Sequence, residues 1–169
     1  MGDIRFRGPL VLVTAMMLHT AVLNQIRIAG VMPDLMLLLA IAVGLEAGAS
    51  YGAVTGFITG MVADLFLPTP LGMSALVFSV MGYATGVTVA GLLRATWWFP
   101  MATAFGGSSL GVGLFALAGT MLGEPDLLNR HLPTIMLIVG ITNGLLVFPT
   151  LRVVRWALAN RTPSSAYAE

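Results

Sequence analysis

Long apolar segments, separated by short stretches rich in Pro, Gly or charge, make up almost the whole of this chain. Only 9% of its 169 residues are charged, whereas 57% are hydrophobic. A soluble domain carries about 25% charged residues, because its surface must stay hydrated. Most of this chain therefore faces lipid or other apolar helices. The pattern predicts an integral membrane protein with no soluble domain large enough to house an enzyme.

The apolar segments predict an all-α fold, a polytopic membrane protein of about six transmembrane helices, since about 20 residues cross the apolar layer. One transmembrane domain, residues 1–158, is expected to contain these spans: 9–29, 33–47, 51–67, 71–93, 101–122 and 132–151. Residues 159–169 are expected to form a disordered cytoplasmic tail, because they are small and polar. The second and third spans are short. The charge distribution favours two full crossings by these spans. A re-entrant pair is the alternative.

Arginine is distributed unequally between the two sides that six spans define. One side holds both termini and most of the basic residues, namely Arg5, Arg7, Arg94, Arg152, Arg155 and Arg161. The other side holds Arg27 and Arg130, together with the acidic residues Asp34, Asp64, Glu124 and Asp126. Because basic residues are enriched in cytoplasmic loops, both termini are expected in the cytoplasm.

Several function classes are excluded or disfavoured by composition. The net charge of +1 argues against a nucleic-acid partner, and the absence of Cys removes disulfides and thiolate metal sites. His19 and His131 are too few and too far apart for a typical zinc site. Catalytic motifs for nucleophilic, zinc-dependent or nucleotide chemistry are also missing. We expect no cofactor, no metal and no enzymatic activity.

Glycines recur every four residues at the start of the third predicted span, at Gly48, Gly52, Gly56 and Gly60. The fourth span repeats this spacing at Gly82 and Gly86. Small residues at this spacing allow two helix backbones to approach closely, which is one way in which membrane helices associate. Packing among the helices of this chain is the favoured interpretation. The alternative is that one stripe binds the membrane helix of a partner.

Asp64 is the acidic residue that the sequence singles out. A carboxylate near the outer edge of the apolar layer is costly unless it is paired or hydrated, so a functional role is one hypothesis. The other, given equal weight, is a helix-end residue in the headgroup zone. Pro33 and Asp34 predict the start of the second span, because Pro is tolerated in a first helical turn and an anion is favoured there.

Other polar residues lie inside the predicted spans. His19, Asn24 and Gln25 in the first span either form hydrogen bonds between helices, which is favoured, or line a polar cavity. Asn143 in the sixth span is interpreted in the same way. Each such residue inside the apolar layer needs a partner.

Four short motifs in order resemble the rod shape-determining protein MreD family. They are Pro33-Asp34; Gly52, Gly56, Phe57, Gly60, Asp64 and Leu65; Pro70, Leu71, Gly72, Ser74, Ala75 and Leu76; and Gly82, Tyr83 and Gly86. The match covers residues 33–86, and the flanking spans agree only in hydropathy and length. Each motif alone is weak, whereas their order and spacing together are moderately specific.

The resemblance implies a non-enzymatic inner-membrane scaffold of the cell-elongation machinery. Family members act with MreC, a single-span protein, and support peptidoglycan synthesis with RodA, its partner transpeptidase and, indirectly, MreB filaments. The implied fold is similar to the substrate-binding component of energy-coupling-factor transporters. A vitamin transporter subunit of that type is therefore the alternative function, although the docking motif typical of its first span is not evident.

The resemblance and the motifs together suggest a mechanism. A glycine stripe of the third or fourth span, with Gly52, Gly56, Gly60, Gly82, Tyr83 and Gly86, is expected to pack helices or to receive the membrane helix of an MreC-like partner. Asp64 and the outer loops are then expected to fix where that helix leaves the membrane.

Overall fold

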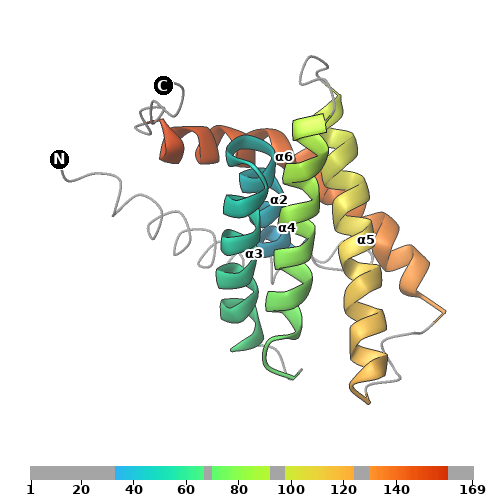
Figure 1. Cartoon of the computed structure of the whole chain (residues 1–169). Helices are drawn as coiled ribbons and strands as arrows, with labels where there is room; N and C mark the ends of the chain where they lie inside the picture. Colours follow the sequence, from blue (N-terminus) through green and yellow to red (C-terminus); the bar gives the residue numbers. More distant parts are fainter. Residues whose placement is uncertain (1–32, 67–69, 92–97, 124–129, 160–169) are drawn as a thin grey trace.

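A computed structural model describes residues 33–66, 70–91, 98–123 and 130–159, and these ranges contain five α-helices and no strand (Figure 1). The helices are α2 (Leu35–Ala47), α3 (Ala49–Asp64), α4 (Met73–Gly91), α5 (Phe99–Met121) and α6 (Leu132–Leu158). The all-α prediction is confirmed for this part of the chain. The first predicted span, residues 9–29, lies outside the described residues, as does most of the predicted tail.

The start of α2 is set by local chemistry. Asp34 is its N-cap residue, and the Asp34 Oδ1 atom accepts hydrogen bonds from the backbone N–H groups of Met36 (3.1 Å) and Leu37 (3.0 Å). These two donors have no partner within the helix, so the side chain replaces the missing carbonyls. The helix therefore begins directly after the Pro33-Asp34 pair.

A single residue separates α2 from α3. Gly48 has a φ of +92° and a ψ of 176°, a conformation that a residue with a side chain rarely adopts. Because the link is so short, the two helices are packed against each other as a hairpin (Figure 1).

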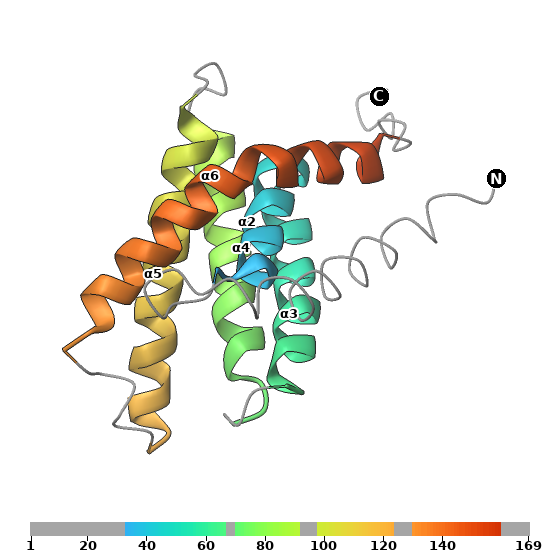
Figure 2. The ribbon, with the colours of Figure 1, turned by 180° about the vertical axis from the view of Figure 1, so that it is seen from behind.

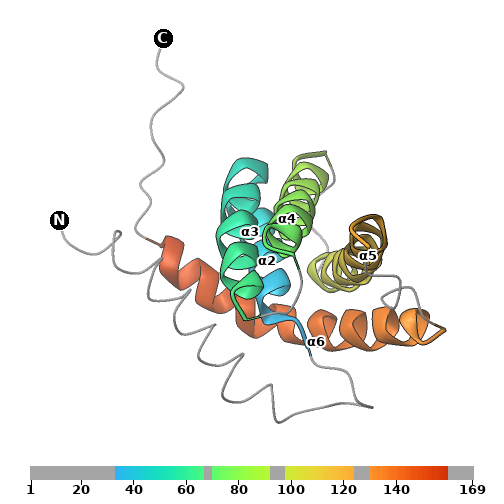
Figure 3. The ribbon, with the colours of Figure 1, turned by 90° about the horizontal axis from the view of Figure 1, so that it is seen from below.

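α2 is the central helix of the described bundle. It lies between the α3–α4 pair and α6, as the view along the helices shows (Figure 3). Every residue from Met36 to Ala42 is buried, so α2 has no lipid-facing side. An apolar helix that is hydrophobic all round is expected at such a position. The core continues into α4, α5 and α6 through Val77, Phe78, Met81, Ala104, Val147 and Leu151.

The N-terminus of α2 lies at mid-height of its neighbours rather than at the end of the bundle (Figure 2). Asn143, near the middle of α6, and Ser108, near the middle of α5, mark the same level, since Asn143 bonds both Ser108 and the backbone of Asp34. With 13 residues, α2 is about 20 Å long, compared with about 30 Å for the apolar layer. The helix itself is thus shorter than the layer, and a full crossing by residues 33–47 stays a prediction.

The sixth helix continues beyond residue 151, where the sixth predicted span ends. α6 extends to Leu158 although Pro149 lies inside it, and its second half turns to run across the bundle (Figures 1 and 2). Proline removes one helical hydrogen bond and commonly bends a helix. Packing overrides this cost, because Leu151 and Val154 are buried against the core.

Two described helices, α5 and α6, are long and apolar enough to cross a membrane. The α2–α3 turn, the end of α4 and the start of α5 lie at one end of the bundle, where the last part of α6 also runs (Figure 1). The α3–α4 loop and the start of α6 lie at the opposite end. Below, these are called the turn end and the loop end.

Candidate functional site

The Asp64 side chain lies at the loop end, where it caps α4. Its Oδ2 atom accepts hydrogen bonds from the backbone N–H groups of Gly72 (2.8 Å) and Ala75 (3.4 Å), and its Oδ1 atom accepts one from Ser74 (3.1 Å). Asp64 is buried, with 2% of its surface exposed. A carboxylate is favoured at a helix N-terminus, where unpaired N–H groups and the helix dipole meet. The acid at the end of α3 thus fixes the start of α4.

These hydrogen bonds give Asp64 a structural role, and a further role in fixing the exit of a partner helix stays a prediction. The partners of Asp64 among the described residues are backbone amides of its own chain, so the charge is already stabilised internally. Arg130, which the sequence places on the same side, is exposed at the same end and forms no ion pair with Asp64. Asp64 is a structural residue of the α3–α4 hairpin.

The glycines of α3 and α4 face each other and form a seam between the two helices. We define the glycine seam as Gly52, Gly56 and Gly60 of α3 with Gly82 and Gly86 of α4. A Cβ atom built on Gly56 would lie 2.7 Å from the backbone nitrogen of Ser79, and one on Gly60 would lie 2.5 Å from that of Ala75. On Gly86 it would lie 2.6 Å from the carbonyl carbon of Gly48. Real Cβ atoms do not approach backbone so closely, so only glycine allows this contact.

The glycine seam therefore serves packing within the chain. Each of these glycines is covered by the opposite helix, in agreement with the favoured interpretation of packing among the helices of this chain, whereas binding of a partner helix by one stripe stays untested. Tyr83 belongs to the same motif but lies on the outer face of α4, 53% exposed.

Two buried hydrogen bonds from Asn143, which we call the polar tie, join three helices at mid-height. The Asn143 side chain on α6 donates hydrogen bonds from Nδ2 to the Ser108 hydroxyl on α5 (2.9 Å) and to the backbone carbonyl of Asp34 (3.1 Å). Asn143 and Ser108 are fully buried. Such bonds between helices hold them in register where water is absent. The sequence predicted a hydrogen-bonding role for Asn143 but gave no sign of its partners.

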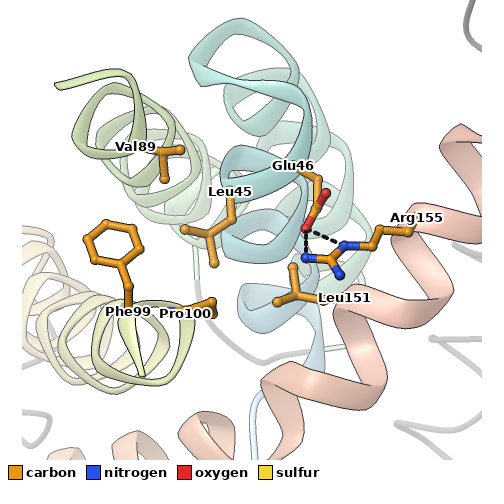
Figure 4. A pocket seen from close by; sticks show the side chains of 7 residues that line it. All are labelled: Leu45, Glu46, Val89, Phe99, Pro100, Leu151 and Arg155. Carbon is orange, nitrogen blue, oxygen red and sulfur yellow. Dashed lines mark hydrogen bonds and ion pairs between the residues drawn. The ribbon is translucent and has the colours of Figure 1, made fainter. Parts of the chain in front are cut away.

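At the turn end, four helices surround a small pocket of about 150 Å³ (Figure 4). Its walls are mostly apolar, and they consist of Leu45 from α2, Val89 from α4, Phe99 and Pro100 from α5, and Leu151 from α6. Glu46 and Arg155 line one side, where their charged groups meet. We call this the end pocket.

The ion pair beside the end pocket links α2 to the last turns of α6. The Arg155 Nε and Nη2 atoms each lie 2.7 Å from the Glu46 Oε1 atom. The hydrogen bond to Glu46 and the charge of that carboxylate raise the pKa of Arg155 above its usual range, against a smaller opposing effect of burial. The Arg155 side chain is 65% exposed, so the pair contributes little to stability. Sequence reasoning missed this pair, because its members are 109 positions apart and share only a predicted side of the membrane.

A second hollow is an open apolar groove between α5 and α6. It has a volume of about 320 Å³. We define the α5–α6 groove by its lining residues, Trp98, Met101, Ala102, Phe105, Ile141, Gly144 and Leu145. Gly144 leaves room in its floor: a Cβ atom there would lie 3.5 Å or more from its neighbours, an ordinary contact. No sequence motif had marked this surface.

Among the described residues, no group of three His, Asp or Glu side chains comes together as a metal site would require. The features that are present hold helices together or offer apolar surface. The arrangement is suited to binding other membrane components through its helices.

Comparison with known proteins identifies the family. The model of the rod shape-determining protein MreD family matches residues 4–155 of the chain, which is nearly its whole length. The chain belongs to the MreD family. No curated protein and no solved structure matches it significantly. Membership makes it a membrane protein with a role in determining rod shape, in a family of structural proteins rather than enzymes.

The residues that carried the resemblance to the MreD family can now be given physical meaning. Pro33 and Asp34 start α2, the spaced glycines form the seam between α3 and α4, and Asp64 with Gly72 and Ser74 forms the cap of α4. In this member of the family these motifs specify how the first part of the bundle folds.

Proposed function

We propose that this MreD-family chain is a non-enzymatic inner-membrane scaffold that binds an MreC-like single-span partner and so supports peptidoglycan synthesis along the cell. The observation that carries the proposal is the family match over residues 4–155. A chain with so little mass outside its helices acts on neighbouring proteins mainly through those helices. RodA, its partner transpeptidase and, indirectly, MreB are further expected members of the same assembly.

The α5–α6 groove is the surface that we propose for the partner helix. It is apolar and open, and no described helix covers it. Membrane helices associate by close packing, which needs a concave surface where side chains of the second helix can enter. The small residues Ala102 and Gly144 provide such a surface, whereas the glycine seam is already filled.

We also propose a multi-pass arrangement with both termini in the cytoplasm. The turn end carries Arg152 and Arg155 on α6, and the loop end carries Asp64 and Arg130. This distribution is consistent with the cytoplasm lying at the turn end. In an arrangement of six crossings, residues 9–29 would form one crossing. Another would consist of α2 together with the residues that precede it in the chain.

A matched pair of substitutions tests the docking surface. Ala102→Leu should fill the α5–α6 groove and reduce co-purification of the MreC-like partner, because its side chain would occupy the space that the partner needs. Ala84→Leu places the same side chain on the exposed face of α4 and should leave co-purification unchanged. The measurement is the amount of partner recovered with a tagged chain from native membranes. Equal recovery of the partner with both variants would contradict the proposed surface. Failure to recover any partner with the unmodified chain would contradict the scaffold function.

The alternative, a vitamin-binding subunit of an energy-coupling-factor transporter, is tested in the same preparation. Submicromolar binding of a vitamin to the purified chain, or recovery of an ATPase module with it, would contradict the scaffold. Recovery of an MreC-like partner without either would support it.

A further inference from the structure

The last part of α6 forms a helical arm across the turn end of the bundle. We call residues 149–158 the terminal arm. It begins at Pro149, inside α6, and this last part of the helix runs crosswise beside α2 and α3 at the turn end rather than along them (Figures 1 and 3). This position places a helix sideways at one end of a group of membrane helices.

The terminal arm has two different faces. Leu151 and Val154 are 4% and 2% exposed and pack into the core. Arg152, Arg155 and Trp156 are exposed on the other side. These three positions follow the i, i+3, i+4 spacing that places side chains together on one helix face. The exposed face therefore combines two guanidinium groups with one indole ring.

Only part of the positive charge on this face is neutralised within the chain. Glu46 holds Arg155 through two contacts to one carboxylate oxygen, which fixes the direction of the guanidinium group. Arg152 forms no ion pair with the described acidic residues Asp34, Glu46 or Asp64. Counted over the described residues, the face therefore keeps a net positive charge.

We propose that the terminal arm lies in the headgroup layer and binds an anionic phospholipid, whose phosphate sits between Arg152 and Arg155. Guanidinium groups bind phosphate through paired charge-assisted hydrogen bonds, and basic residues beside a membrane attract anionic lipids. An indole ring favours the interface, where its apolar body and N–H group are both accommodated. The proposal depends on the membrane location of the chain and not on its protein partner.

Native mass spectrometry of the purified chain can test this, with phosphatidylglycerol and phosphatidylcholine supplied in equal amounts. The unmodified chain should retain phosphatidylglycerol preferentially. Arg152→Gln should reduce that preference about fivefold, as expected for one basic residue near an anionic surface. Arg152→Lys should retain most of it. The matched control is Arg130→Gln, which removes an exposed arginine at the loop end and should have no effect.

A second variant separates lipid binding from a structural role. Glu46→Gln removes the acid that neutralises Arg155, so it should increase the preference for phosphatidylglycerol although it weakens the link between α2 and α6. A decrease with Glu46→Gln would overturn the proposal. Equal retention of both lipids by the unmodified chain would also overturn the proposal. The cationic face would then be assigned to binding an acidic protein segment instead. Equal losses with Arg152→Gln and Arg130→Gln would show that no local site exists.

Discussion

At the scale of single residues, the polar groups buried in this bundle are used to position backbone. Asp64 holds the first turn of α4, and Asn143 links Asp34, the N-cap residue of α2, to α5 and α6. The sequence marked both residues as polar groups in apolar surroundings, because each must be stabilised there. It did not provide their partners, since those are backbone groups or a residue 35 positions away. Periodicity carries no information on such pairs.

Asp64→Ala should destabilise the chain by about 2 kcal/mol, because the N–H groups of Gly72 and Ser74 would lose a charged acceptor in a buried position. The apparent Tm in detergent should fall by about 4–8 °C. Glu46→Gln removes a largely solvated ion pair, so it should change the apparent Tm by less than a quarter of the change caused by Asp64→Ala. A Tm equal to that of the unmodified chain would contradict the capping role.

Asn143→Ala should cost about 1 kcal/mol, in the range measured for hydrogen bonds between membrane helices. Thr142→Val is the control, since the Thr142 hydroxyl bonds only the carbonyl of Ile138 in its own helix. Thermal unfolding followed by fluorescence would measure both. A larger effect from Thr142→Val than from Asn143→Ala would exclude the polar tie as a source of stability.

At the scale of helices, the sequence predicted the positions of the described elements within a few residues, because Pro, Gly and charge interrupt the apolar runs there. The end of α6 is the exception. α6 passes Pro149 because Leu151 and Val154 find buried positions. This depends on tertiary contacts, which local patterns do not contain. The α5–α6 groove likewise arises only when two distant helices meet.

The glycine seam allows a direct test at this scale. Gly56→Ala should separate α3 from α4 and cost about 1–3 kcal/mol, because its Cβ atom would overlap the backbone of Phe78 and Ser79. Gly106→Ala on α5 makes the same change where nothing lies within 4 Å. It should be neutral or slightly stabilising, since alanine favours helix. Unfolding in detergent would compare them, and similar values for both would contradict close packing at the seam.

At the scale of the whole molecule, the absence of Cys makes the topology directly measurable. Single cysteines at Ser50 and Ala159, both at the turn end, should react with a membrane-impermeant thiol reagent only after the cytoplasmic side is opened. A cysteine at Gly123 or Arg130, at the loop end, should react in intact cells. Reaction of Ser50→Cys and Arg130→Cys from the same side would contradict the proposed orientation.

The single glycine between α2 and α3 also constrains how the protein is made. A helix of 13 residues is shorter than the roughly 20 residues that an independently inserted segment needs. With only Gly48 as a link, α2 and α3 have to enter the bilayer together, and α2 finds its place only when α4 and α6 enclose it. We therefore expect the nascent chain to remain exposed to quality-control proteases until α6 has been synthesised, so that truncations before residue 132 are degraded rather than accumulated.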